Sequence, residues 1–101
     1  MKIIIISIHS WALHYLKDSF SIKQLKCVTL ITDKLTSDLK KYLTINNIPH
    51  LVTKKLSTKK LNNIDIKNAI VISAGSPWIF DKELIRVFGK KFYNVHQSPL
   101  P

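Results

Sequence analysis

The chain has 101 residues, of which 46% are hydrophobic and 22% charged, values typical of one soluble globular domain. Its net charge is +10, and every lysine or arginine except Arg86 is a lysine. Proteins that read nucleic-acid bases favour arginine, whose guanidinium group forms bidentate hydrogen bonds. Nucleic acid is therefore not the expected partner. The single cysteine, Cys27, excludes an internal disulfide and a multi-cysteine metal site and favours a reducing, cytoplasmic setting.

The first predicted elements are a strand and a helix. Residues 2–7 form a near-continuous β-branched run, which is typical of a strand covered on both faces. Ser10 is predicted to cap a helix whose apolar positions, Ala12, Leu16 and Phe20, recur every four residues. The apolar run at the start is too short for a membrane span, and it lacks the features of a signal peptide.

A second strand and helix follow in the same order. Residues 27–32 (CVTLIT) are predicted to form a buried strand, and Thr36 is predicted to cap a helix with its apolar side chains on one face. Asn46, Asn47 and Pro49 are expected to end that helix. Residues 48–53 are predicted to form a short third strand.

The second half of the chain repeats the alternation. Residues 57–63 are predicted to form at most one turn of helix, and residues 69–73 (AIVIS) a fourth buried strand. Asp81 is predicted to cap a short helix that Gly89 closes, and residues 92–96 to form a fifth strand. The alternation predicts an α/β, Rossmann-like parallel sheet of about five strands in the order 3-2-1-4-5, with helices on both faces.

Two common functions of such sheets are excluded by composition. Binding of a dinucleotide or of a nucleoside triphosphate at the first turn requires several glycines, whereas the chain holds only Gly75 and Gly89. The four histidines show no HxxxH or HxH spacing, so no metal site is expected.

The end of the fifth strand carries a candidate catalytic pair. Alternate side chains of a strand point the same way, so Asn94 and His96 are expected to face one cleft, while Val95 faces the core. An amide can donate a hydrogen bond to a developing oxyanion, and an imidazole can exchange a proton near neutral pH. The alternative interpretation is that both side chains merely end a strand and cap a loop.

A family resemblance favours the catalytic interpretation. The segment NVHQSPLP resembles the N-x-H-x-S-x-L-P signature of the tetrahydrofolate-dependent formyltransferases, and NNIPH and AIVISAGSPWIFDKELI resemble the residues that precede it in that family. The resemblance implies a Rossmann-like fold, N10-formyltetrahydrofolate as co-substrate, and Asn94 and His96 as two of three catalytic residues. It also implies that one loop binds the folate, formed by Ala74, Gly75, Ser76, Pro77 and Trp78.

The resemblance further implies a domain and an acceptor. The family's third catalytic residue is an aspartate downstream of the signature, so residues 1–101 are expected to be the N-terminal part of a catalytic domain. The glycine-free segment SIHSWALHYL looks closest to the sugar-nucleotide N-formyltransferases, which act on an amino sugar linked to a nucleoside diphosphate.

Three alternatives remain open at this point. Methionyl-tRNA or another amine could be the acceptor, the chain could be a small basic RNA-binding module, or it could be a non-catalytic fragment. A homodimer of the complete protein is a further expectation.

Overall fold

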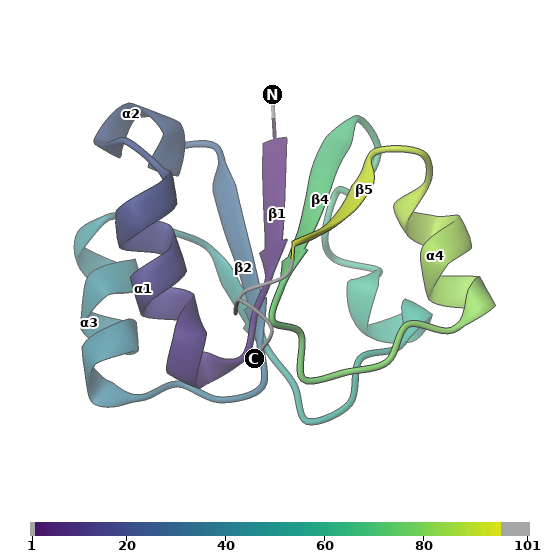
Figure 1. The fold of residues 1–101 in the computed structure, drawn as a ribbon, viewed down its shortest axis with the longest axis horizontal. Helices are drawn as coiled ribbons and strands as arrows, with labels where there is room; N and C mark the ends of the chain where they lie inside the picture. The colour runs from purple at the N-terminus through teal and green to yellow at the C-terminus, as the bar shows by residue number, and fades with distance from the viewer. Residues whose placement is uncertain (1, 96–101) are drawn as a thin grey trace, which may run out of the picture.

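The computed structural model describes residues 2–95, which form a five-stranded, all-parallel sheet with helices on both faces (Figure 1). The strand order is β3-β2-β1-β4-β5, which confirms the predicted order and the predicted Rossmann-like α/β class. The strands are β1 (Lys2–Ile6), β2 (Val28–Thr32), β3 (His50–Val52), β4 (Ala69–Ala74) and β5 (Phe92–Val95).

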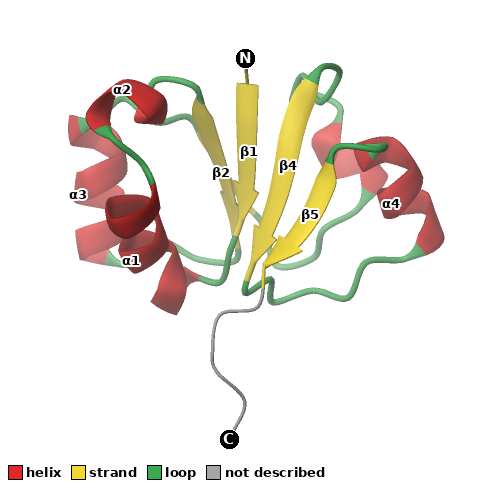
Figure 2. Cartoon of the chain, turned by 45° about the horizontal axis from the view of Figure 1, so that its top comes forward, coloured by secondary structure: helices red, strands yellow, loops and turns green. Residues whose placement is uncertain are grey.

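Four α-helices and one 3₁₀ turn occur in the described part of the chain. Three of the helices lie on one side of the sheet, and the fourth lies on the other (Figure 2). Their bounds are α1 (His9–Ser19), α2 (Ile22–Leu25), α3 (Ser37–Ile45), η1 (Thr58–Leu61, the 3₁₀ turn) and α4 (Lys82–Phe88). Among residues 2–95 there is no helix with the length and apolar character needed to span a membrane.

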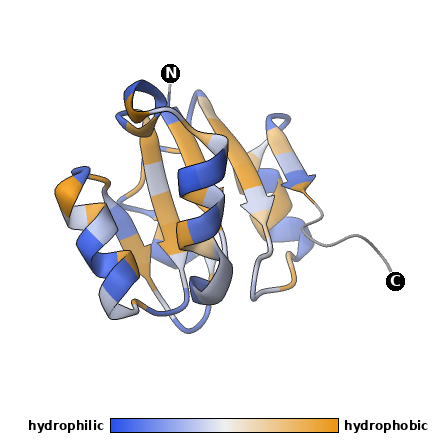
Figure 3. Cartoon of the chain, turned by 60° about the vertical axis from the view of Figure 1, so that its left-hand side comes forward, coloured by the Kyte–Doolittle hydropathy of each residue, from blue (hydrophilic) through white to orange (hydrophobic). Residues whose placement is uncertain are grey.

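The two faces of the sheet bury separate apolar clusters. On one face, α1, α2 and α3 pack over β1 and β2, where Ile5 and Leu30 are fully buried. On the other face, η1 and α4 pack over β1 and β4, where Ile4, Ile6 and Val71 are fully buried. Because successive side chains of a strand point to opposite faces, an unbroken apolar run is needed to fill both clusters. Each such side chain contributes about 1.5–3 kcal/mol on burial, and hydrophobic residues accordingly concentrate in the strands (Figure 3).

The predicted caps of the later helices are confirmed. The hydroxyl of Thr36 accepts the Leu39 N–H of α3 at 3.3 Å, and the carboxylate of Asp81 accepts the Leu84 N–H of α4 at 2.8 Å. Gly89 ends α4 with φ of 76° and ψ of −157°, a conformation that is essentially restricted to glycine. Local side-chain chemistry therefore sets these boundaries.

The predicted cap of the first helix is wrong. Ser10 lies inside α1, which begins at His9 with Ile8 as its N-cap, and no side chain of the cap residue bonds to the helix. Instead, Asp33 from the loop after β2 accepts the His9 N–H at 2.9 Å. A carboxylate far away in sequence therefore replaces the local hydroxyl that the sequence pattern favoured.

Other elements also differ from the sequence prediction, and β1 and β4 do so by one residue at their ends. Helix α2 was not predicted, although Ser21 and Gln24 form a capping box around its first turn. Strand β2 begins one residue later than predicted, and Cys27 is exposed. Strand β3 is only three residues long, because the chain between Asn47, which has φ of 54°, and Pro49 turns before pairing begins.

Candidate functional site

The carboxyl ends of all five strands meet at one edge of the sheet. The direction in which successive strands are added reverses between β1 and β4: β2 and β3 lie on one side of β1, whereas β4 and β5 lie on its other side. Ligands of such sheets bind outside this edge at the point of reversal. The loops there are joined by hydrogen bonds: the Ile8 N–H donates to the Gly75 carbonyl at 2.7 Å, and the Trp78 indole N–H donates to the Lys54 carbonyl at 3.0 Å.

Asn94 lies at this edge. It pairs with Ser73 in the register of β4 and β5, and its side chain is exposed. The next residue of β4, Ala74, begins the loop that the sequence predicts to bind the folate. Two segments that are far apart in sequence, Asn94 and the loop of residues 74–78, are therefore neighbours on adjacent strands.

The loop after β4 has an ordered internal structure. Ala74 is buried as the last residue of the strand, and Gly75 takes φ of 68°, which favours glycine. The Ser76 hydroxyl accepts the Trp78 N–H at 3.0 Å and lies 3.1 Å from the Trp78 carbonyl, to which it donates. Pro77 is exposed at the tip. These bonds hold the loop in one shape next to Asn94.

Trp78 also has a structural role. Its ring packs against the apolar cluster under α4, and its indole N–H is bonded to the chain after β3. A contact between its ring and a folate stays a prediction.

Val95 and His96 are the two residues of the signature that follow Asn94. His96 and the residues after it lie outside the described residues, so the role predicted for His96 stays a prediction. The prediction that Val95 faces the core is wrong, because its side chain is 39% exposed. Val95 pairs with Ala74 on an edge strand, while α1, α2 and α3 pack over β1 and β2 on that face of the sheet (Figure 1).

The structure brings a second pair of polar side chains to the same edge, His9 and Asp33. Nδ1 of His9 lies 3.1 Å from both carboxylate oxygens of Asp33, and the two side chains are 26% and 23% exposed. The carboxylate can only accept, so the proton of a neutral ring is on Nδ1 and Nε2 is left as a proton acceptor. This pair combines a basic nitrogen with a carboxylate that orients it, at the carboxyl edge of the sheet.

The pKa of Asp33 reflects this contact. Burial by itself raises the pKa of the carboxyl, but the backbone and side-chain hydrogen bonds from His9 outweigh burial. The pKa of Asp33 therefore lies below its ordinary value. Asp33 stays ionised at neutral pH and holds the imidazole ring in place.

Sequence reasoning missed this pair. His9 and Asp33 are 24 residues apart and match no short motif. One signal was present, since each residue comes just after the end of a buried strand, and parallel strands end at a common edge. Considering His9 only as a metal ligand left that signal unused.

Comparisons with known proteins do not add a family to this geometry. No family model, no curated protein and no solved structure matches the chain. Within the part of the chain that the structure describes, no group of three or more His, Cys, Asp or Glu side chains is arranged to hold a metal ion.

Proposed function

We propose that this chain is the N-terminal part of an N-formyltransferase that uses N10-formyltetrahydrofolate. The acceptor is the amine of an amino sugar linked to a nucleoside diphosphate. The observation that carries the proposal is the pairing of Ser73 with Asn94, because it joins the signature asparagine to the loop of residues 74–78 at one edge of the sheet. The family resemblance assigns these two segments to the same site.

The reaction needs an oxyanion donor and a route for one proton. The acceptor nitrogen attacks the formyl carbon, and the carbonyl oxygen gains negative charge in a tetrahedral intermediate. The bond to N10 of the folate then breaks, N10 takes a proton and the acceptor amine loses one. Asn94 donates a hydrogen bond to the oxyanion, a contact worth about 10²–10³ in kcat. His96 stabilises the same charge or carries the proton, an effect of about 10²–10⁴.

The His9–Asp33 pair gives the acceptor amine a base at the same edge. Ile6 of β1 pairs with Ser73, which pairs with Asn94, so two strand spacings, about 10 Å, separate β1 from Asn94. His9 follows Ile6 by three residues and begins α1 at the same carboxyl edge. Where His96 stabilises the oxyanion, Nε2 of His9 takes the proton that the attacking amine must lose, and Asp33 stabilises the resulting imidazolium.

The substitution Asn94→Ala tests the proposal. In the complete polypeptide, which includes the downstream aspartate, we expect kcat for transfer of radiolabelled formyl from N10-formyltetrahydrofolate to an amino-sugar nucleotide to fall about 10²–10³-fold, while KM for the folate changes little. Asn62→Ala is the matched control, since Asn62 is also an exposed asparagine but lies beside η1, away from the strand carboxyl ends. Near-normal turnover in Asn94→Ala contradicts the catalytic role. Transfer to a different amine would keep the reaction and overturn the acceptor.

A further inference from the structure

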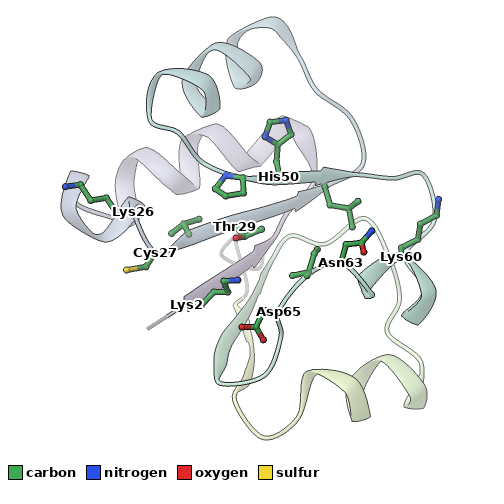
Figure 4. A pocket seen from close by; sticks show the side chains of 12 residues that line it. Lys2, Lys26, Cys27, Thr29, His50, Lys60, Asn63 and Asp65 are labelled. Atoms are coloured by element: carbon green, nitrogen blue, oxygen red, sulfur yellow. The ribbon is translucent and has the colours of Figure 1, made fainter.

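A cavity of about 520 Å³, the amino-edge cavity, lies at the opposite edge of the sheet, where β1, β2 and β3 begin (Figure 4). Its volume is within the range of about 300–1,000 Å³ that small-molecule sites occupy. We propose that it binds an organic phosphate, a small molecule in which a phosphate group adjoins an apolar ring. The inference is independent of formyl transfer, because Lys2 lies about 13 Å along β1 from Ile6, the residue at the level of Asn94, and the rest of the lining comes from β2, β3 and the segments beside them, on the other side of β1 from Asn94.

The lining of the cavity is cationic. Lys2, Lys26 and Lys60 contribute three ammonium groups, against one carboxylate from Asp65. Within residues 2–95, the ion pairs are His9 with Asp33 and His14 with Asp18, so no carboxylate of this part of the chain lies within 4.0 Å of these lysines. The excess positive charge is therefore available to an anion.

Neutral hydrogen-bond donors also line the cavity, beside the lysines. Figure 4 shows Lys2 from β1, Thr29 from β2 and Asn63 from the segment after η1 around one space. Within the described residues, neither the Thr29 hydroxyl nor the Asn63 amide bonds to another protein group. His50 also lines the cavity, and its ring is held by a hydrogen bond from Nδ1 to the Ile48 carbonyl at 3.1 Å. Ammonium, hydroxyl and amide groups together suit the several acceptor oxygens of a phosphate.

The rest of the lining is apolar. It consists of Val28 at the start of β2, Pro49 just before β3, Leu51 in β3 and Ile64 after η1. Such a wall gains little from a free inorganic anion, but it can cover a ring or another apolar group attached to the phosphate. The combination of donors and apolar wall therefore selects an organic phosphate over phosphate alone.

A ¹⁵N NMR titration of the full chain tests this site. We use adenosine 5′-monophosphate as the probe and inorganic phosphate in a parallel titration. The nucleotide is expected to shift the amide signals of residues 26–29, 50–51 and 60–65, to leave those of residues 74–76, 78 and 94 unchanged, and to bind more tightly than inorganic phosphate. Equal affinity for both anions contradicts the role of the apolar wall. Absence of shifts in the cavity contradicts the site itself.

Two double variants separate this site from general attraction to a basic protein. Lys2→Gln/Lys60→Gln removes two charges from the cavity and is expected to weaken the nucleotide by about tenfold. Lys23→Gln/Lys82→Gln removes the same charge from exposed positions outside the cavity and is expected to leave the dissociation constant within about twofold. Equal weakening by both variants, with shifts spread over the lysine-rich surface, would overturn the proposal. These outcomes do not depend on folate binding or formyl transfer.

Discussion

Asp33 connects the local structure of the candidate site to the stability of the fold. One of its oxygens accepts the first N–H of α1 and also lies near the His9 ring. A negative charge at this position complements the positive end of the helix dipole. Asp33 therefore stabilises a helix terminus and also orients the imidazole of His9, which we propose takes a proton from the acceptor amine.

Replacement of this carboxylate should make stability less dependent on pH. We expect Asp33→Asn to lower the free energy of unfolding at pH 7 by about 0.5–2 kcal/mol. The folded pKa of Asp33 lies below the unfolded value of about 3.9. The contribution of its charge is therefore present above that value and is lost as the pH falls through the folded pKa.

Urea unfolding from pH 7 to pH 2.5 measures this effect. The difference between the wild-type protein and Asp33→Asn should shrink below about pH 4. Asp18→Asn is the control, because Asp18 is 61% exposed and its pair with His14 is expected to contribute only a few tenths of a kcal/mol. A difference between wild type and Asp33→Asn that is constant over the whole pH range would show that the charge of Asp33 does not act as described.

At the scale of elements, α1 and α3 begin in different ways. Thr36 caps α3 through its own hydroxyl, whereas α1 relies on Asp33 from another loop. A cap that is local in sequence can be recognised from residue type and spacing alone. A cap supplied across the sheet depends on which strand ends are neighbours, and no window of sequence around Ser10 contains that information.

Two alanine substitutions distinguish the two kinds of cap. Thr36→Ala is expected to lower the free energy of unfolding by about 1 kcal/mol, because the Leu39 N–H loses its acceptor. Ser10→Ala should change it by less than about 0.5 kcal/mol, because Ser10 is exposed inside the helix and its hydroxyl forms no hydrogen bond within the described residues. Chemical denaturation measures both. A loss of about 1 kcal/mol in Ser10→Ala would mean that Ser10 caps α1 after all.

Helix α2 shows a local signal that the sequence interpretation did not use. Ser21 and Gln24 have the spacing of a capping box, and both of its hydrogen bonds form. The element is only four residues long, so its apolar period is too short to detect. Short helices of this kind are recognised from their caps rather than from their periodicity.

At the scale of the whole molecule, the topology could be predicted because several constraints agree. Uniformly apolar strands require cover on both faces, and right-handed crossovers between parallel strands leave few orders of the sheet. The place of Asn94 at the carboxyl edge follows from the same topology. The sites that were missed depend on long-range packing: the His9–Asp33 pair needs two loops to meet, and the amino-edge cavity needs the segment after η1 to lie against β2.

The position of a bound folate tests the central claim most directly. N5-formyltetrahydrofolate is a stable analogue of the co-substrate, and a ¹⁵N NMR titration of the chain reports where it binds. We expect amide shifts in residues 74–76, 78 and 92–95, none in the amino-edge cavity, and stabilisation of about 2.7 kcal/mol at a hundredfold excess over the dissociation constant. Shifts confined to the cavity, or no shifts at millimolar folate, would contradict a formyltransferase site at the carboxyl edge.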